Sequence, residues 1–509
     1  MKIKALTRSL DAHAPARKGD AAPTSHNLDA SQHPFDRPRE YTRALNASKL
    51  ERMHAKPFVG ACEGHSDGVY SLALDSKRLA FAATGAGDGE IRLWDLSSKT
   101  TIKSYYGAHR GIISSLVISP ISFPSGLSFA SEGSTRNSRL SGRRLLSAGT
   151  DRVVRMWDAD PEASRFGGGG DEAQGGDADE DEELELTGAG SIRRANWTQK
   201  EDQALSSWTS PTALNSLSHH ARDPRFVSAS SAIQLWDITR GNDSAERESG
   251  ALRTMEWGAE SINCVRFNMA ETEVLASAGS DRGIVLYDLR SASPLTKMIM
   301  SMRANDIAWS PVEPTTFAVA SEDHNVYTFD MRNLKSATQI YKSHVAAVMS
   351  VSYSPTGQEL LSGSYDRTLR LWNVGSGSRS RDTYHASRMQ RIFCSSYTYD
   401  NRFVLSGSDD GNLRVWKTRA SEKLGIKSGK ELAAMEYRDK LREKWNKVGE
   451  VGKIDAQRRL PKAITSARKL KGTMLEAERV KEERRRKHTK SGQHKPKAAR
   501  MAAILAHKK

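Results

Sequence analysis

One phrase recurs seven times along the chain, and each copy ends in an aromatic residue that follows alternating apolar residues. The copies close at these aromatic positions: Trp94, Trp157, Trp236, Tyr287, Phe329, Trp372 and Trp416. A representative copy reads SGSYDRTLRLWNV over residues 362–374. The last four gaps between the aromatic residues are 51, 42, 43 and 44 residues. A period of about 40–45 residues is typical of arrays in which each repeat forms one small four-stranded sheet.

The phrase has the composition of two strands joined by a tight turn. Asp followed by Arg or Gly supplies the turn, and alternating residues such as Leu369 and Leu371 fit a half-buried strand. One such sheet cannot cover its own faces, so the sheets stack radially into a closed ring. The seven copies therefore predict an all-β fold, a seven-bladed WD-repeat β-propeller over residues 57–417. We expect the strand-like segment PFVGACEGH at 57–65 to close the ring as the outer strand of the seventh blade.

Some copies carry an upstream histidine, which places a Ser, a His and an Asp in one repeat. In the sixth copy, His344, Ser362, Asp366 and Trp372 are expected to form one buried hydrogen-bonded chain. The pattern does not favour a hydrolase, because a catalytic set occurs once in a chain whereas this set recurs in several blades. A structural role fits better, since buried networks with all hydrogen bonds satisfied rigidify a core. We expect no nucleophile elbow, no metal site, no cofactor and no enzymatic activity.

Charge divides the chain into two parts. Residues 417–509 hold 29 Lys and Arg against 11 Asp and Glu, a net charge of +18, whereas residues 1–416 hold 48 against 50, a net charge of −2. Such an asymmetry suggests a nucleic-acid partner for the tail. The three widely spaced cysteines predict buried reduced thiols. No apolar run reaches membrane-spanning length, so a soluble intracellular protein without a membrane partner is expected.

Three segments lie outside the repeats. Residues 1–56 form an N-terminal extension in which Pro38 is expected to open a helix over 39–53. The apolar residues expected on one side of this helix are Tyr41, Leu45, Leu50 and Met53. Insertions at about 120–143 and 160–196 have the composition of disordered loops, and the second holds nine acidic residues between Asp171 and Glu185.

The C-terminal tail, residues 418–509, predicts two helices. Ser428 with Glu431 has the spacing of a capping box. The stripe that follows, repeating every fourth residue, consists of Ala433, Tyr437, Leu441 and Trp445. Either the propeller or a partner is expected to cover it, which makes Tyr437, Leu441 and Trp445 candidate protein contacts. After a basic connector, a second helix is expected to begin at a capping box formed by Thr473 and Glu476, with i,i+4 ion pairs from Glu482 and Glu483.

These segments together resemble a known family. HPFDRPREYTRALNASKLERMHAKPF at the N-terminus, YHASRMQRIF, ASEKLGIKSGKE, RRLPKAI and ERRRKHTKSG are similar to the Sof-type WD-repeat proteins of the small-subunit processome. The resemblance runs from about residue 32 through the tail. It implies a non-catalytic nucleolar scaffold in ribosome biogenesis, which assembles with pre-rRNA, a box C/D small nucleolar ribonucleoprotein and other processome proteins to support processing of the small-subunit rRNA.

The resemblance also implies an alternative, because some animal members are described as substrate receptors of a cullin-RING ubiquitin ligase. The relevant Asp-x-Arg pattern falls on Asp288-Leu289-Arg290 and Asp330-Met331-Arg332, where Tyr287 and Phe329 replace the usual Trp. Arg290 and Arg332 are therefore candidate protein contacts, expected at blade edges on one face of the ring. A ligase receptor does not need a tail of this charge, whereas an RNA-bound scaffold uses it directly.

The basic tail is expected to contact RNA. Its candidate phosphate-binding residues are Lys469, Lys471, Arg484, Arg485, Arg486 and Lys487. Lys and Arg supply affinity for the backbone without reading sequence. The same RRRKH run fits a nuclear-import signal, which agrees with a nuclear and nucleolar location.

Overall fold

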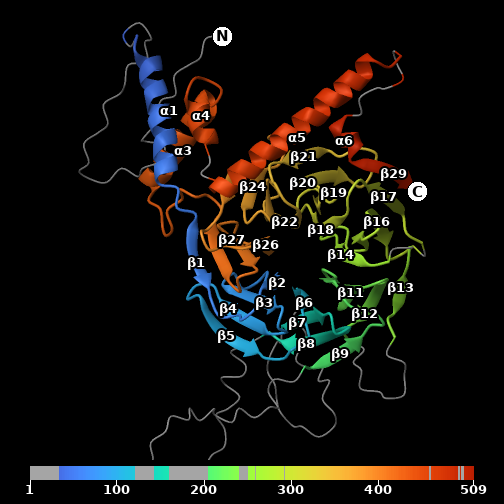
Figure 1. The fold of residues 1–509 in the computed structure, drawn as a ribbon. Coiled ribbons are helices and arrows are strands. Elements are labelled where there is room, and N and C mark those ends of the chain that lie inside the picture. Colours follow the sequence, from blue (N-terminus) through green and yellow to red (C-terminus); the bar gives the residue numbers. More distant parts are fainter. Residues whose placement is uncertain are drawn as a thin grey trace, which may run out of the picture.

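The computed structural model describes residues 32, 34–120, 143–159, 204–239, 250–257, 260–291, 293–457, 460–490, 493 and 498–508. The N-terminal residues 1–31, the inner residues of the two expected insertions and the acidic run lie outside the described residues. Among the described residues, seven antiparallel sheets are arranged radially around one axis (Figure 1). The seven-bladed propeller expected from the repeats is therefore confirmed.

Blades 1 to 3 contain β2 (Val69–Leu74), β3 (Phe81–Ala86), β4 (Ile91–Asp95), β5 (Thr100–Tyr105), β6 (Ile113–Ile118), β7 (Arg144–Gly149), β8 (Val153–Asp158), β9 (Ser206–Thr209), β10 (Ser216–His219), β11 (Arg225–Ala229), β12 (Ile233–Asp237) and β13 (Arg253–Met255). Blades 4 and 5 contain β14 (Ile262–Phe267), β15 (Val274–Gly279), β16 (Gly283–Asp288), β17 (Thr296–Met300), β18 (Ala304–Trp309), β19 (Thr316–Ser321), β20 (Asn325–Asp330) and β21 (Gln339–Lys342). Blades 6 and 7 contain β22 (Val348–Tyr353), β23 (Glu359–Ser364), β24 (Leu369–Asn373), β25 (Asp382–Tyr384), β26 (Ile392–Tyr397), β27 (Phe403–Ser408), β28 (Leu413–Lys417) and β1 (Phe58–Cys62).

The ring closes through strands from opposite ends of the chain. β1 pairs antiparallel with β28, so that Phe58 lies opposite Trp416 and Cys62 lies opposite Leu413. β1 is thereby the outer strand of blade 7, as expected from the sequence. Blade 4 has a fifth strand, β29 (Ile504–Lys508), which comes from the C-terminus and pairs with β17. This strand was not predicted from the sequence.

The aromatic residue that ends each repeat packs against the preceding blade, and each Trp among them donates its indole N–H to a buried Ser or Thr. In blade 6, His344 Nδ1 lies 2.9 Å from Asp366 and Nε2 lies 2.7 Å from Ser362 Oγ, which also accepts the Trp372 indole N–H at 2.8 Å. The predicted chain is confirmed. Burial also raises the pKa of Cys62 to about 11 and that of Cys264 to about 12, which keeps both as thiols.

The N-terminal helix α1 (Asp36–Met53) begins earlier than expected. Pro38 occupies its third position, which a helix tolerates because the first four N–H groups have no intrahelical partner. The expected apolar side is partly wrong, since Leu50 and Met53 are 37% and 66% exposed. Tyr41 and Leu45 do pack in the buried face, beside Glu40, Ala44, Ala47 and Ser48. The small Ala and Ser side chains let another helix approach closely.

The tail forms α3 (Gly429–Trp445), α4 (Val451–Ala456), α5 (Lys462–Lys487) and α6 (Ala499–Ala502). The Ser428 and Glu431 capping box is present. The second expected helix starts eleven residues earlier than Thr473, because the basic connector from Lys462 is itself helical after Pro461. Thr473 lies inside α5 and donates to the carbonyl of Leu470 at 2.7 Å, so it caps nothing. Within the described ranges, no helix combines the length and apolar character needed to cross a membrane.

Candidate nucleic-acid interface

The apolar stripe of α3 is covered by the chain itself. Leu441 and Trp445 are buried with Ala44 of α1 and Val451 of α4, and Tyr437 packs against them from the edge. The Trp445 indole N–H donates to Glu40 Oε1 at 3.1 Å, and Lys444 Nζ lies 2.6 Å from the same oxygen. The candidate contacts Leu441 and Trp445 thus lie inside the molecule, in a unit formed by α1, α3 and α4 that we call the helical module.

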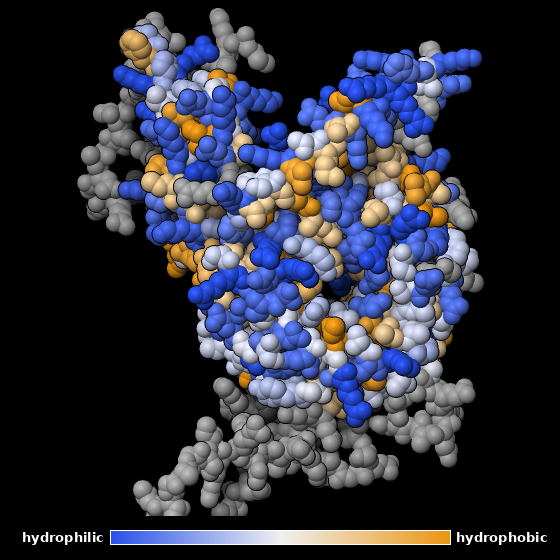
Figure 2. All heavy atoms as spheres, in the orientation of Figure 1, coloured by the Kyte–Doolittle hydropathy of each residue, from blue (hydrophilic) through white to orange (hydrophobic). Residues whose placement is uncertain are grey.

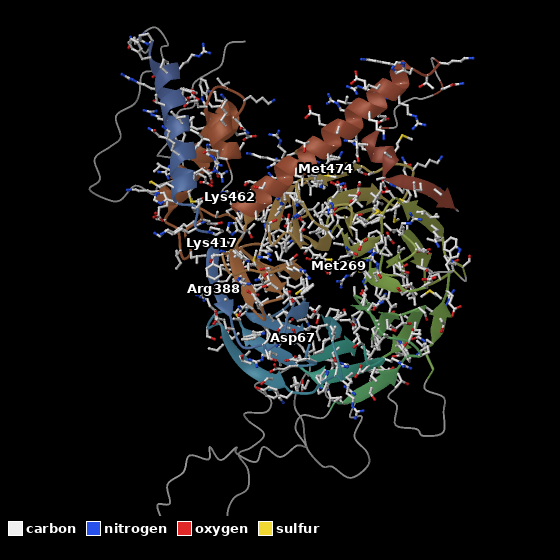
Figure 3. All side chains as sticks on the ribbon, in the orientation of Figure 1. Asp67, Met269, Arg388, Lys417, Lys462 and Met474 are labelled. Carbon is white, nitrogen blue, oxygen red and sulfur yellow. The ribbon has the colours of Figure 1, made fainter. Side chains whose placement is uncertain are left out.

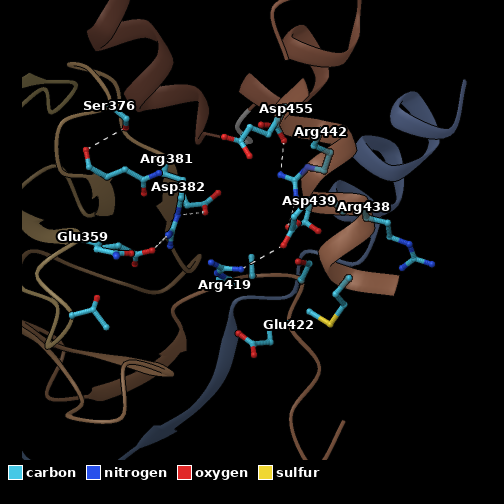
Figure 4. A pocket seen from close by; sticks show the side chains of 18 of the residues that line it. Glu359, Ser376, Arg381, Asp382, Arg419, Glu422, Arg438, Asp439, Arg442 and Asp455 are labelled. Carbon is cyan, nitrogen blue, oxygen red and sulfur yellow. Dashed lines mark hydrogen bonds and ion pairs between the residues drawn. The ribbon is translucent and has the colours of Figure 1, made fainter. Parts of the chain in front are cut away.

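The helical module docks on blades 6 and 7, and polar contacts hold it there. Arg52 lies 3.5 Å from Asp382 of blade 6, and the Lys56 N–H donates to the carbonyl of Ala420 at 2.9 Å. A groove of about 1290 Å³ remains between the module and the ring (Figure 4). Acidic and basic side chains alternate along it, as in the Arg442–Asp455 pair at 2.8 Å, so the groove has no single sign of charge.

The ring presents two different faces. We call the face that carries the turns between second and third strands, including Asp366, the turn face. The opposite face, which carries the links between third and fourth strands, is the link face. α5 leaves the helical module and crosses the ring at blades 6 and 5, where Lys471 Nζ donates to the carbonyl of His344 at 3.1 Å (Figures 1 and 3). This contact places α5 on the turn face, because His344 lies in the connection that enters blade 6 beside Asp366.

α5 is anchored at its start and exposed beyond Lys471. Ile464 is its buried residue, whereas residues 472–485 are all exposed. Figure 2 shows hydrophilic side chains over the outer end of this helix. The predicted i,i+4 pairs are present, with Arg486 3.3 Å from Glu482 and Lys487 3.6 Å from Glu483. The outer half of α5 is therefore a charged rod that stands away from the ring.

The six predicted RNA contacts divide by location. Lys469, Arg484, Arg485 and Lys487 are exposed, and Arg486 is half-buried beside Glu482. Lys471 is different, because it packs on the propeller. Burial lowers the pKa of its ammonium group; Asp323 and Asp366 oppose that shift, and Arg370 adds to it. The sequence grouped Lys471 with the outer cations, but the fold assigns it to the seam between α5 and blade 6.

Arg290 and Arg332 occupy matching positions after β16 and β20, so both lie on the link face. Each pairs with the Asp two residues earlier, at 3.1 Å for Asp288 and 2.8 Å for Asp330. Their side chains are 68% and 71% exposed. The paired Arg holds the pKa of each Asp carboxyl below its usual value, first of all through a side-chain hydrogen bond.

The repeated His–Ser–Asp chains have a structural arrangement. In blade 2, His109 lies 2.6 Å from Ser147, whose Oγ also accepts the Trp157 indole N–H at 2.8 Å, as in blade 6. The expectation of no nucleophile elbow needs one correction, since GHSDG at 64–68 has the Gly-x-Ser-x-Gly spacing. Ser66 lies in a loop that leads into β2 rather than a helix, and it donates to Asp88. It therefore lacks the strand–turn–helix context of a nucleophile.

One group of potential metal ligands was missed in the sequence: His220, Asp223 and Glu273. They come from two neighbouring blades, so spacing along the chain gave no signal. His220 Nδ1 accepts backbone N–H groups from Arg222 at 3.2 Å and Asp223 at 2.8 Å. An acceptor at Nδ1 places the proton on Nε2. The Nε2 atom that faces Glu273 is then a donor, which is unsuited to bind a metal.

Sequence comparisons agree with this architecture. A Sof1-like domain matches residues 418–504, and the WD domain (G-beta repeat) matches residues 56–95, 335–373 and 379–417. The Sof1-like match thus covers the helices α3, α4, α5 and α6.

Full-length relatives extend the match across the chain. The DDB1- and CUL4-associated factor 13 of Xenopus laevis is 36% identical over 492 residues, covering 97% of this chain and 96% of the relative. Its human counterpart is 37% identical over 492 residues, with the same coverage. Protein SOF1 of Saccharomyces cerevisiae is 34% identical over 491 residues, covering 96% of this chain and 92% of the relative. With a WD-repeat ring, a matching tail and relatives that align along nearly their whole length, the chain belongs to the Sof1-like family of WD-repeat proteins.

Proposed function

We propose that this chain is a non-catalytic ribosome-biogenesis scaffold of the small-subunit processome that acts in the nucleolus. In this role it assembles with pre-rRNA, a box C/D small nucleolar ribonucleoprotein and other processome proteins, and it supports maturation of the small-subunit rRNA. Membership of the Sof1-like family supports the proposal. Propellers host many functions, so the function has to be assigned from a specific surface.

The exposed cations on the outer half of α5 are the main support for this proposal. Its exposed cations stand clear of the ring, where a polyanion can approach from several sides. Arg484 and Arg485 lie in a run of four basic residues that two glutamates partly offset. Such a surface binds nucleic-acid backbone through counterion release, with little dependence on sequence.

The test measures RNA binding by the full chain over a salt series. A variant with Arg484→Gln, Arg485→Gln, Arg486→Gln and Lys487→Gln removes the outer cations without touching a buried side chain. If all four neutralise phosphates, the slope of log K against log salt becomes shallower by about 2.8, at about 0.7 for each phosphate on a single strand.

A matched control removes four exposed cations from the helical module: Arg438→Gln, Lys440→Gln, Lys447→Gln and Lys453→Gln. This variant keeps the wild-type slope if the contact belongs to α5. Copurification of pre-rRNA with the tagged full chain tests the processome role itself. A chain that brings down no pre-rRNA contradicts the proposal.

A second candidate function is that of a substrate receptor in a cullin-RING ligase, which the names of the two DDB1- and CUL4-associated relatives favour. The exposed Arg290 and Arg332 on the link face are the residues that would reach the adaptor. Exposed ion pairs contribute little to stability, so their removal leaves the fold intact.

The test combines Arg290→Ala with Arg332→Ala and measures capture of the DDB1 adaptor. Arg303→Ala is the control, because Arg303 also pairs with an acid, Glu322 at 2.5 Å, but lies at the opposite end of its blade. Loss of adaptor capture in the double variant alone supports the receptor role. Equal capture by all three proteins removes these arginines from it.

A further inference from the structure

Cations converge where α5 crosses blade 6. Arg370 comes from β24, Lys342 from the end of β21, and Arg468 and Lys471 from α5. Arg370 is 1% exposed, Lys471 is half-buried, and Lys342 and Arg468 are exposed at the rim. The seam is therefore positively charged, with the buried guanidinium of Arg370 below cations that are exposed at its rim.

The two acidic residues at this seam already accept hydrogen bonds from other groups. Asp366 accepts from His344 Nδ1 at 2.9 Å, from the Val345 N–H at 3.2 Å and from the Thr368 N–H at 3.0 Å. Arg370 Nη2 lies 3.7 Å from Asp366, too far for a hydrogen bond, and this buried nitrogen has no hydrogen-bond partner among the described residues. The second acid, Asp323, accepts the Tyr327 hydroxyl and the Asn325 N–H.

In blade 7, the arginine at the position equivalent to Arg370 does have hydrogen-bond acceptors for its guanidinium group. Arg414, the equivalent of Arg370, donates to Ser408 Oγ at 2.6 Å and pairs with Asp410 through both of its terminal nitrogens. In blade 6, His344 and Thr368 occupy the corresponding carboxylate. An unpartnered buried donor is costly, about 1–3 kcal/mol and more for a charged group. Arg370 Nε donates to Thr368 Oγ1 at 3.4 Å, but its Nη2 lacks the acceptor that its counterpart has.

The electrostatics of the seam also show an excess of positive charge. Burial, and then the neighbouring Arg468, lower the pKa of Arg370 to about 10 although Asp366 opposes the shift. Lys471 donates to the carbonyl of His344 and so uses one of three N–H donors. Four cations face two acids here, which leaves an excess of two positive charges and several free donors.

We propose that the seam between α5 and blade 6 binds a phosphate group of a single-stranded RNA backbone, through Arg370, Arg468, Lys471 and Lys342. A phosphate supplies the planar acceptor edge that a guanidinium fork matches. This inference rests on the proposed function and names the part of the propeller that would share the RNA with α5. Single-stranded RNA is favoured over a phosphopeptide because α5 continues from the seam for about 20 Å towards Arg484, at about 1.5 Å per residue. Beyond the seam, α5 carries Arg479, Lys481 and the basic run 484–487, interspersed with four glutamates. A chain of phosphates can reach these further cations, whereas a single phosphoryl group cannot.

The experiment measures amine acetylation of the full chain by mass spectrometry, with and without a 12-nucleotide oligouridine. We expect the RNA to protect Lys342 and Lys471, while Lys453 in the helical module is modified equally in both samples. A peptide with one phosphoserine, at matched phosphate concentration, serves as the second probe and is expected to leave Lys342 unprotected.

Paired variants separate the seam from the remaining charge of α5. Arg468→Gln with Lys471→Gln is expected to abolish RNA protection of Lys342. It should also make the fall in affinity between about 50 and 200 mM salt smaller, by about threefold per lost contact. Lys462→Gln removes an exposed cation at the start of the same helix, outside the predicted RNA contacts, and it should leave Lys342 protected.

The outcomes decide the inference separately from the proposed function. Protection of Lys342 that depends on Arg468 and Lys471 supports the seam. RNA binding without protection of Lys342, or equal protection by the phosphopeptide, overturns it. Failure of the full chain to bind the oligouridine also overturns it. Copurification with pre-rRNA in any of these cases leaves the scaffold role standing.

Discussion

α3 and α5 belong to the same basic tail but have opposite relations to the rest of the molecule. α3 buries Leu441 and Trp445 against α1, a segment about 400 residues earlier in the chain. α5 is longer, yet Ile464 is its buried residue, and its outer half is exposed. The comparison teaches that a uniformly basic tail can contain a structural part and a ligand-facing part, and that burial of the apolar side chains tells them apart.

The largest expected effect removes the platform on which both helices dock. Trp372→Ala deletes a fully buried ring and leaves Ser362 without its indole donor. Such a truncation destabilises a core by about 3–5 kcal/mol. We expect this loss in urea unfolding of the ring, whereas Tyr106→Ala, at an exposed aromatic residue, changes stability by less than about 0.5 kcal/mol. Equal effects of the two variants would show that the stability of the ring does not depend on the buried Trp372 and its hydrogen bond to Ser362.

Acid should weaken the ring before it affects the tail. Burial lowers the pKa of His65 and of His219 to about 4, whereas an unfolded His titrates near 6.5. Between these values the unfolded state binds more protons, so stability falls as the pH drops from about 6.5 to 4, by about 3 kcal/mol at most for each His.

Thermal unfolding between pH 7 and pH 4 checks this. His65→Gln should flatten the profile. His488→Gln, at an exposed position at the end of α5, should leave the profile unchanged. A wild-type midpoint that is independent of pH contradicts the prediction.

Leu441→Ala tests whether α3 is structural. The side chain is fully enclosed by α1 and α4, and its truncation should cost about 2–3 kcal/mol locally. Because the ring core is separate, we expect faster hydrogen exchange in residues 36–53 and 429–445 with little change in the blades. The control is Leu432→Ala, at an exposed position on the same helix, which should exchange like the wild type. Release of the blades together with the helices would mean that the helical module and the ring unfold as one unit.

Met474→Ala makes the corresponding change in α5 and should have the smallest effect. Met474 is exposed in the middle of the helix (Figure 3), so stability should stay within about 0.5 kcal/mol of the wild type. Chemical denaturation provides the measurement. A loss comparable to that of Leu441→Ala would place Met474 in a packed contact and end the distinction between the two helices.

The repeat units were predictable because their information is local. Seven aromatic positions, the turn that precedes each one and the His344 chain all follow from residues within one repeat, and the structure confirms them. The expected outer strand at Phe58–Cys62 was also readable, because an unpaired strand next to a closed array has one place to go. The capping box at Ser428 is equally local.

Predictions failed where a segment depends on distant partners. The apolar face proposed for the N-terminal helix was partly wrong, because Ala44 docks on α3 while Met53 stays exposed. The start of α5 was misplaced by a capping pattern at Thr473 that lies in the middle of a helix. β29 was missed because five residues at the end of the chain become a strand only when β17 offers an open edge.

The sequence by itself determined the number of blades, the residues that fill them and the separation of a near-neutral ring from a basic tail, because hydrophobic period and charge are properties of neighbouring residues. Only the tertiary structure decided which cations of the tail remain free. Lys471 and Arg484 look alike in the sequence, yet the path of α5 across the turn face brings Lys471 beside Arg370 and His344 and leaves Arg484 in solvent. Burial and electrostatic environment depend on what the chain folds against, and local sequence does not specify that.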